Sequence, residues 1–467
     1  MATGRSKSWR TTMSITWTCA RWRHLSINQA SLWQKVDLET IPCSILKLFE
    51  ERNTILPWSL SFNNDLYDPN DQIRRQFLVD HIHFTRKLAF FSSYPVSYLP
   101  ATMEAPFLES LRVTIDTLPD GATTPIRFVN HPRLHKLSLS RQLYSSSPSA
   151  FCALRKLTIN LEFWEPRGKT LSFFSILTAC PDLEELALCE LFIRRVFDDL
   201  PSDDLLNTLT LTPFQQLKKL RLGLSLRDIH LFLSLFKFSP DLVLNLEPFL
   251  EEVEEEEYNF SPLLPLDPRC LPSLKSTCEL IIDPGNDICL TAHRIEYPSS
   301  SPTDAVVEHV PFLQVKTDDM DVPFRTQNII ELLRFLPSVQ HLQIACWNTR
   351  QPLYTVNSAI ATMLKMVPSL RHLHLSRCSQ NTCKALSIWA QYTQLQALPC
   401  LHSLTIYQTD LRNCSADLVA LCRNLSTHLK NIWLLECQVV SDYQGTRILQ
   451  DLRNSGIPNV FLESRVT

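Results

Sequence analysis

Thirteen histidines and fifteen cysteines are the residues of this 467-residue chain with the greatest potential for metal or nucleophilic chemistry. His131 and His135 are four positions apart, but the stretch His-Pro-Arg-Leu-His lacks the glutamate of a zincin, and its proline disfavours a helix. The cysteines are dispersed, without a Cys-x-x-Cys pair, and no spacing gives a thiol a positioned base. We therefore predict no metal site, no cofactor and no catalytic residue, and expect that the protein is not an enzyme.

Glycine is scarce, with 7 residues in the whole chain. The closest pair, Gly445 and Gly456, is eleven positions apart. The G-x-G-x-x-G loop, the Walker A loop and the G-x-S-x-G elbow all need clustered glycines, which bring backbone close to a phosphate or expose a nucleophile. The spacing excludes these nucleotide-binding and hydrolase motifs.

The overall charge gives no sign of nucleic-acid binding, because 45 basic residues are balanced by 48 acidic ones. No apolar run approaches the length of a membrane span, so no membrane partner is expected. Hydrophobic residues make up 45% of the chain, which is enough for a large core. Dispersed cysteines without an export signal are typical of reduced thiols, and we expect a protein of the cytoplasm, the nucleus or both.

One pattern, Pro-x-Leu-x-x-Leu-x-Leu, recurs along most of the chain. Clear copies are Pro106–Val113, Pro132–Leu139, Pro181–Leu188, Pro337–Ile344, Pro368–Leu375 and Pro399–Ile406, and weaker ones lie at Leu88–Phe90, Leu280–Ile282 and Pro458–Leu462. Leu370 and Leu401 are 31 positions apart, and Leu401 and Leu429 are 28 apart. This period, combined with Leu-x-x-Leu-x-Leu, is the signature of leucine-rich repeats.

The residue types within each unit predict a short strand followed by a helix. In Leu-x-Leu two apolar side chains alternate with an outward one, as in a half-buried strand. Between copies, apolar residues at helical spacing occur, as in Leu418-Leu421-Cys422-Leu425, and the proline of the next copy ends the helix. The predicted fold class is α/β: a leucine-rich-repeat solenoid with a curved parallel sheet, helices on its convex face and a short helical cap at the N-terminus.

The repeat consensus places Asn or Cys three positions after the second strand leucine, where it satisfies backbone groups between repeats. Cys378 and Cys437 occupy this position, which favours a structural role over a reactive one. The equivalent residues elsewhere are Asp116, Gln142, Ser225 and Thr409.

The pattern divides the chain into four parts: a helical segment over 1–35, a first block of repeats over 36–247, an interruption over 248–324 and a second block over 325–467. The interruption contains the acidic run Glu251–Glu257 and a proline-rich stretch from Asp283 to Pro323. We interpret both as insertions or loops on the rim, because like charges repel and remain solvated. Binding of a basic partner by the acidic run is the alternative.

The N-terminal segment places Cys19-x-x-Trp22 and then Ser31-Leu32-Trp33 directly before the first strand. This arrangement resembles the end of an F-box, and with the repeats it is similar to fungal F-box leucine-rich-repeat proteins. The resemblance covers residues 19–38 and the generic repeat. The Leu-Pro motif and aliphatic helix that open the family's F-box are absent from Met1–Thr18. The alternative is that these residues only cap the first repeat, as the exposed end of a solenoid requires.

The resemblance implies a substrate-recognition subunit of a cullin-type ubiquitin ligase. Contact with the Skp-type adaptor would then come from Cys19, Trp22, Leu25, Leu32 and Trp33, while the concave face of the repeats would hold a protein substrate. The alternative function is a leucine-rich-repeat interaction scaffold without a ubiquitin link. The identity of the substrate is not encoded in these motifs.

The residues that flank the inward leucines should point to the concave face. In the first block these are Arg112, Lys136, Lys156, Lys219 and Arg221, with Glu185 among them; in the second block they are His341, His372, His374, Tyr407 and Trp433. The second set is the predicted partner-binding surface, because outward aromatic residues are enriched at binding hot spots. The alternative for Trp433 is that it packs beneath a C-terminal cap over Tyr443–Arg453.

Overall fold

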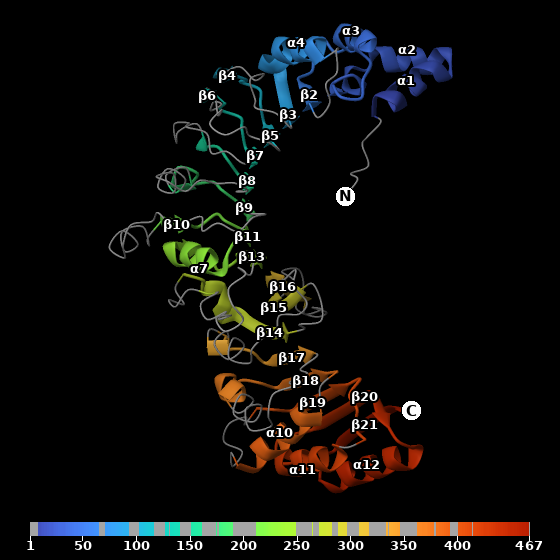
Figure 1. Ribbon diagram of the computed structural model, residues 1–467, viewed down its shortest axis with the longest axis vertical. Helices are drawn as coiled ribbons and strands as arrows, with labels where there is room; N and C mark the ends of the chain where they lie inside the picture. Colours follow the sequence, from blue (N-terminus) through green and yellow to red (C-terminus); the bar gives the residue numbers. More distant parts are fainter. Residues whose placement is uncertain are drawn as a thin grey trace, which may run out of the picture. The chain divides into compact units, whose positions relative to one another are not determined.

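The computed structural model describes residues 8–64, 71–92, 102–115, 127–129, 131–140, 151–160, 174, 177–189, 212–248, 264, 270–282, 288–296, 308–316, 333–334, 336–345, 362–377, 380–392, 400–412 and 414–466. The chain forms two compact units, Met1–Asn207 and Thr208–Thr467. The sequence pattern predicts an interruption between two blocks of repeats at 248–324. Each unit contains a mostly parallel sheet and helices, so the protein is an α/β protein (Figure 1).

In the first unit the main sheet is parallel, and each of its described strands pairs with the next strand of that sheet along the chain. The strands are β1 (Lys35–Asp37), β2 (Trp58–Asn64), β3 (Thr85–Ser92), β5 (Ser110–Ile115), β7 (Lys136–Ser140), β8 (Lys156–Asn160) and β9 (Glu185–Cys189). A separate parallel pair joins β4 (Thr102–Glu104) to β6 (Arg127–Val129). The helices are α1 (Ser8–Thr18), α2 (Ala20–Asn28), α3 (Cys43–Arg52) and α4 (Asp71–His81), with 3-10 turns at Ala30–Leu32 and Ile82–Phe84.

The register of this sheet follows from the alternation of leucines in the sequence. One row across neighbouring strands consists of Leu88, Leu111, Leu137, Leu157 and Leu186, which are all at most 2% exposed. Burying a leucine side chain contributes about 1.5–3 kcal/mol, and a shift by one residue would expose the whole row. The Leu-x-Leu spacing therefore determines both the buried face and the pairing of the strands.

In the second unit the sheet has the order β11-β13-β16-β15-β14-β17-β18-β19-β20-β21. These strands are β11 (Lys219–Gly223), β13 (Val243–Leu246), β14 (Thr277–Ile282), β15 (Ile288–Glu296), β16 (Glu308–Lys316), β17 (His341–Ala345), β18 (His372–Ser376), β19 (Ser403–Tyr407), β20 (Asn431–Val439) and β21 (Asn459–Val466). The short strands β10 (Thr212–Phe214) and β12 (Phe236–Phe238) form a parallel pair outside it. The helices are α7 (Leu226–Leu235), α10 (Gln380–Tyr392), α11 (Ser415–Leu425) and α12 (Asp442–Asn454), with a 3-10 turn at Pro272–Ser276.

The stretch 283–323, interpreted from the sequence as an insertion or a loop on the rim, contains two long strands and is therefore not only loop. β15 pairs antiparallel with both β14 and β16, while β14 pairs parallel with β17 and β16 parallel with β13. Antiparallel strands can be joined by a short hairpin, whereas parallel strands need a crossover that is usually a helix. This stretch therefore lacks the strand–helix unit that the Leu-x-x-Leu-x-Leu pattern accompanies. The signal that remains is the alternation of Leu290 and Ala292, both buried, with Thr291.

From β17 to β21 the strands are parallel and consecutive, and equivalent residues recur after each. Leu342, Leu373, Leu404, Ile432 and Val460 form one buried register row. The next structural feature along the strands is also repeated: Arg377, Gln408 and Glu436 have left-handed φ values of 50°, 49° and 52°. The backbone N–H of Arg377 donates to Tyr407, at 2.9 Å, and that of Gln408 donates to Leu435, at 3.0 Å. The same bend thus follows the ends of β18 and β19 and recurs within β20 at a shift of register between Leu435 and Cys437.

Cys437 fills the slot predicted for it. Its side chain is buried, and its Sγ lies 3.5 Å from the carbonyl oxygen of Ile406 on the preceding strand. Thr409, in an equivalent slot, is buried and bonds to the carbonyl of Tyr407 at 3.1 Å, while Ser225 caps α7 by accepting from the Asp228 N–H at 3.2 Å. Cys378, Asp116 and Gln142 lie outside the described residues.

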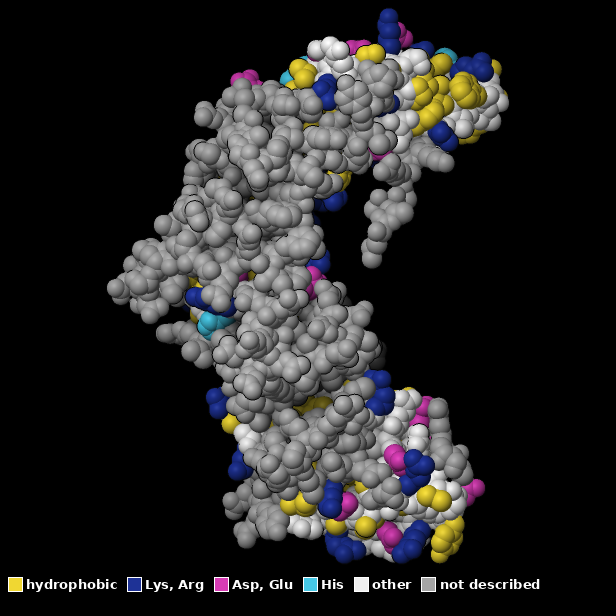
Figure 2. All heavy atoms as spheres, viewed as in Figure 1, with side chains coloured by type: hydrophobic (Ala, Val, Ile, Leu, Met, Phe, Trp, Pro, Cys, Tyr) yellow, Lys and Arg dark blue, Asp and Glu magenta, His cyan; other side chains and the backbone are white. Residues whose placement is uncertain are grey.

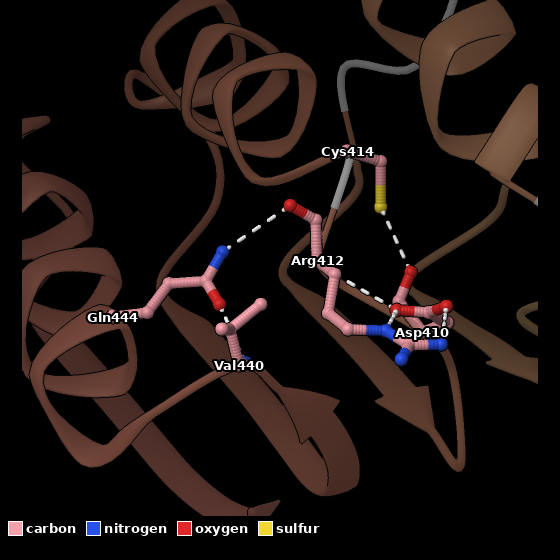
Figure 3. A network of polar contacts seen from close by, with 5 residues as sticks. All are labelled: Asp410, Arg412, Cys414, Val440 and Gln444. Atoms are coloured by element: carbon pink, nitrogen blue, oxygen red, sulfur yellow. Dashed lines mark hydrogen bonds and ion pairs between the residues drawn. The ribbon is translucent and has the colours of Figure 1, made fainter. Parts of the chain in front are cut away.

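Helices α10, α11 and α12 lie side by side next to the last strands, and α11 forms where the apolar helical spacing predicted a helix (Figure 1). A network of polar contacts joins α12 to the loop that leads into α11 (Figure 3). The Gln444 amide accepts from the Val440 N–H at 2.7 Å and donates to the carbonyl of Arg412 at 3.2 Å. The guanidinium of Arg412 donates to the Asp410 carboxylate at 2.6 Å and lowers the pKa of that carboxyl.

Among the described residues, no helix has the length and apolar character that crossing a membrane requires.

Candidate functional site

The N-terminal end of the first unit is a helical hairpin made by α1 and α2. Cys19 is the N-cap of α2, and its carbonyl accepts from the N–H of Arg23 at 2.9 Å. The Arg23 guanidinium donates back to the carbonyl of Thr16 at 3.0 Å, which ties the two helices together. Cys19 itself is exposed.

This hairpin exposes large apolar side chains. Trp22 and Leu25 on α2 are 55% and 52% exposed, and Trp17 on α1 is 68% exposed. Figure 2 shows hydrophobic side chains, together with Lys and Arg, at the end of the molecule that carries these helices. Because the sequence has no acidic residue before Asp37, the Arg side chains of the hairpin itself are not balanced by carboxylates on α1 or α2. Exposed apolar groups of this size on one element mark candidate interaction sites.

Trp33, predicted with Trp22 as part of the adaptor-contacting set, is buried and does not belong to the exposed patch. Its side chain is 1% exposed, its indole N–H donates to the carbonyl of Ser26 at 2.7 Å, and its ring packs edge-on against Phe49 at 5.0 Å. Leu32 is half-buried beside it. Trp33 therefore anchors α2 to α3. Trp17 was not predicted as a contact residue, because it lies outside the Cys-x-x-Trp motif and no other sequence pattern marks it as exposed.

In the second unit, the strands from β17 to β21 have one face of buried leucines and one opposite face that is more accessible. We call the latter the open face of the second unit. Its middle register row consists of Gln343, His374, Thr405, Trp433 and Phe461. Neighbouring strands are about 4.8 Å apart, so side chains in this row lie within reach of one another. Four of the five predicted partner-binding residues fall in this row or the adjacent row that contains His341 and His372.

His341 and His372 face each other from β17 and β18, with ring centroids 4.2 Å apart. The Nδ1 atom of His372 also makes a hydrogen bond with the hydroxyl of Ser403 on β19. Burial makes the largest contribution to lowering the pKa of His372, and the positive charges of neighbouring histidines and Arg371 lower this pKa further. The ring is therefore held in its neutral form at pH 7.

His374 and Tyr407 meet edge to face, with ring centroids 6.3 Å apart and an interplanar angle of 82°. Burial lowers the pKa of His374, and its Nε2 atom is buried without a hydrogen-bond partner among the described residues. The Gln408 amide donates to the Tyr407 hydroxyl and to Glu436 Oε2, both at 2.9 Å. Tyr407, the fifth predicted residue, is thus fixed at the carboxyl end of its strand.

Trp433 lies on the open face, since Ile432 and Leu434 on either side of it are fully buried on the other face. Its ring stacks on Phe461 of β21, a residue that the sequence reasoning did not select. Phe461 lies in the weak copy Pro458–Leu462. The only sequence feature that marks it as a surface residue is its outward position between two aliphatic residues. The open face therefore brings the histidines, Tyr407 and an aromatic pair onto neighbouring strands.

The basic residues predicted for the first block have different surroundings. Lys156 forms an ion pair with Glu185 at 2.7 Å, and Arg221 forms one with Glu247 at 2.6 Å. Lys219 and Arg221 belong to the second compact unit. Arg112 and Lys136 are exposed on β5 and β7.

The described residues contain no group of three or more His, Cys, Asp or Glu side chains able to hold a metal ion. His131 is buried, with its Nδ1 atom 3.1 Å from the carbonyl oxygen of Ala105. Burial raises the pKa of the Cys180 thiol to about 12, and that of Cys437 to about 11. A thiol held in its protonated form is a poor nucleophile, so these two cysteines suit a structural role.

Comparison of the chain with models of known protein families and with curated proteins gives no match.

Proposed function

We propose that this chain is a leucine-rich-repeat solenoid that acts as the non-catalytic substrate-recognition subunit of a cullin-type ubiquitin ligase, through an F-box-like N-terminal hairpin. The observation that carries the proposal is the exposure of Trp22 and Leu25 on a helix packed directly before the first strand of a parallel ladder. The hairpin would dock a Skp-type adaptor, and the open face of the second unit would bind a protein substrate.

Support for the repeat interpretation comes from equivalent features at intervals of 28 and 31 residues. The buried row Leu342, Leu373, Leu404 and Ile432 keeps its register at these intervals, and so do the left-handed residues after β18 and β19. An array in which each unit contacts its neighbours provides an extended binding surface, and it needs a cap at its ends. We place the protein in the cytoplasm or nucleus, where thiols such as exposed Cys19 and Cys152 remain reduced.

The experiment that tests this proposal is co-purification of the tagged full-length chain with a co-expressed Skp-type adaptor. The double variant Trp22→Ala/Leu25→Ala should weaken adaptor binding by at least about tenfold, since truncated anchors typically cost 2 kcal/mol or more. The matched control is Ile55→Ala/Val79→Ala, which removes two other exposed apolar side chains of the same unit. Both double variants should keep the wild-type melting temperature.

A wild-type chain that retains no adaptor would overturn the ligase proposal. The alternative, an interaction scaffold without a ubiquitin link, is favoured by the lack of a Leu-Pro motif in Met1–Thr18. It would be supported if a partner protein bound the open face of the second unit while no adaptor bound the hairpin.

A further inference from the structure

Three exposed basic side chains come from three consecutive strands of the first unit. Lys87 on β3 and Lys136 on β7 both pair in register with Ser110 of β5, so they occupy one row. Arg112 occupies the adjacent row, between Ala89 and Ser138. All three alternate with buried residues and therefore lie on the face opposite the leucine row. We call these three residues the basic row.

Carboxylates on the same face are already engaged. Glu185 pairs with Lys156 at 2.7 Å, and Asp37 accepts hydrogen bonds from the hydroxyls of Ser61, at 3.2 Å, and Thr40, at 3.0 Å. Neither Lys87 nor Lys136 takes part in any of the ion pairs found among the described residues. Among the described residues, Lys87 and Lys136 of the basic row therefore carry positive charge that no ion pair engages.

Arg112 has a second feature, because its guanidinium carbon lies 5.0 Å from the ring centroid of Phe91. Stacking on an aromatic ring orients the guanidinium plane while leaving its N–H donors available for an acceptor. Lysine side chains on either side add point charges, and neighbouring strands about 4.8 Å apart put Lys87 and Lys136 about 10 Å from each other at their backbones. The arrangement is a shallow, oriented set of donors for anionic groups.

We propose that the basic row binds an Asp/Glu-rich extended segment of a partner protein. Same-side residues of an extended peptide repeat about every 6.8 Å, which lets alternate carboxylates reach successive members of the row. A nucleic acid fits less well, because Arg112 lies over the ring of Phe91 and the described residues of the three strands place no second aromatic ring in the basic row for base stacking. This inference goes beyond the proposed function, since it assigns a partner class to the first unit and does not depend on the adaptor.

The test is a fluorescence-anisotropy titration of the full-length chain with a labelled twelve-residue peptide of alternating Asp and Ser at low salt. The triple variant Lys87→Gln/Arg112→Gln/Lys136→Gln should bind at least about tenfold more weakly, because exposed ion pairs each contribute up to about 1 kcal/mol. The matched control Lys47→Gln/Lys237→Gln/Lys275→Gln removes the same charge from exposed lysines elsewhere. It should bind like wild type, and an Asn/Ser peptide should not bind to any of the three proteins.

Equal binding by the wild-type chain and the basic-row variant would overturn the inference, as would equal weakening by the control variant. Tighter binding of a single-stranded oligonucleotide than of the acidic peptide at the same row would replace the protein partner with a nucleic acid. Since the measurement contains no adaptor, loss of adaptor binding and loss of peptide binding are independent results.

Discussion

The indole ring of Trp433 lies nearly parallel to the phenyl ring of Phe461 on the next strand, with 6.1 Å between centroids and 8° between the planes. Phe461 is 50% exposed, so the pair forms an aromatic surface at the C-terminal end of the second unit rather than part of its core. Stacked aromatic rings with one accessible face are suited to bury area against a partner.

The first prediction is that Trp433→Ala lowers the free energy of unfolding by no more than about 1.5 kcal/mol, because an accessible aromatic pair contributes little beyond the area it buries. Leu404→Ala, on the buried face of the neighbouring strand, should cost about 2–5 kcal/mol. Urea unfolding of both variants measures the difference. A loss at Trp433 as large as that at Leu404 would show that the tryptophan packs in the core, as in the alternative interpretation of a C-terminal cap.

The second prediction concerns the locality of stability. Leu373→Ala should increase amide hydrogen exchange in β17, β18 and β19 more than in β5, because β18 pairs directly with β17 and β19. Leu111→Ala in β5 is the reciprocal variant and should loosen its own neighbours first. A uniform increase along the whole chain, for either variant, would contradict nearest-neighbour stabilisation.

The third prediction concerns the different contributions of Trp22 and Trp33 to stability, although the sequence assigns both to the same predicted contact set. Trp33→Ala should cost about 3–5 kcal/mol, since it removes a buried ring, its contact with Phe49 and the hydrogen bond to Ser26. Trp22→Ala should leave the melting temperature nearly unchanged, because most of that side chain is exposed. Thermal melts of both variants test this, and similar losses in the two would show that the hairpin packs differently.

The fourth prediction is a pH dependence that arises from His372. Burial and nearby positive charge hold the pKa of His372 below its unfolded value of about 6.5. Its contribution to stability is therefore complete above that pH and declines as the pH falls from 6.5 toward the lowered pKa, where the unfolded chain binds the extra proton. His372→Asn should flatten this part of the profile in urea unfolding at pH 5–8, and an unchanged slope would contradict it.

Much of the strand framework could be predicted because each Leu-x-x-Leu-x-Leu copy specifies period, face and register at once. Even the weak copies at Leu88–Phe90 and Leu280–Ile282 form strands, since two alternating apolar residues suffice when a neighbouring strand is already in register. The strands β15 and β16 were missed because an antiparallel hairpin has no helix and no proline stop. Their pairing depends on residues far apart in sequence, such as Leu244 with Leu313.

The candidate sites were predictable only as positions on a face. Alternation correctly separated Trp433 from its buried neighbours, but it could not reveal that Phe461 would become its stacking partner. Likewise, the motif around Trp22 and Trp33 contains no signal that distinguishes an exposed indole from one that anchors α2 to α3. That difference depends on whether the packing of α1 and α3 covers each ring.

The antiparallel insertion of β15 between β14 and β16 has a consequence for how this chain can change in length. Between β17 and β21 each strand pairs with its sequence neighbours, so excision of residues 372–402 would bring Leu404 opposite Leu342 and keep every buried row. Around β14–β16 the same operation fails, because β13 pairs with β16 and β14 with β17, so these strands are interlocked. Gain or loss of one whole strand–helix unit should therefore be tolerated between β17 and β21 and should disrupt the sheet around β14–β16.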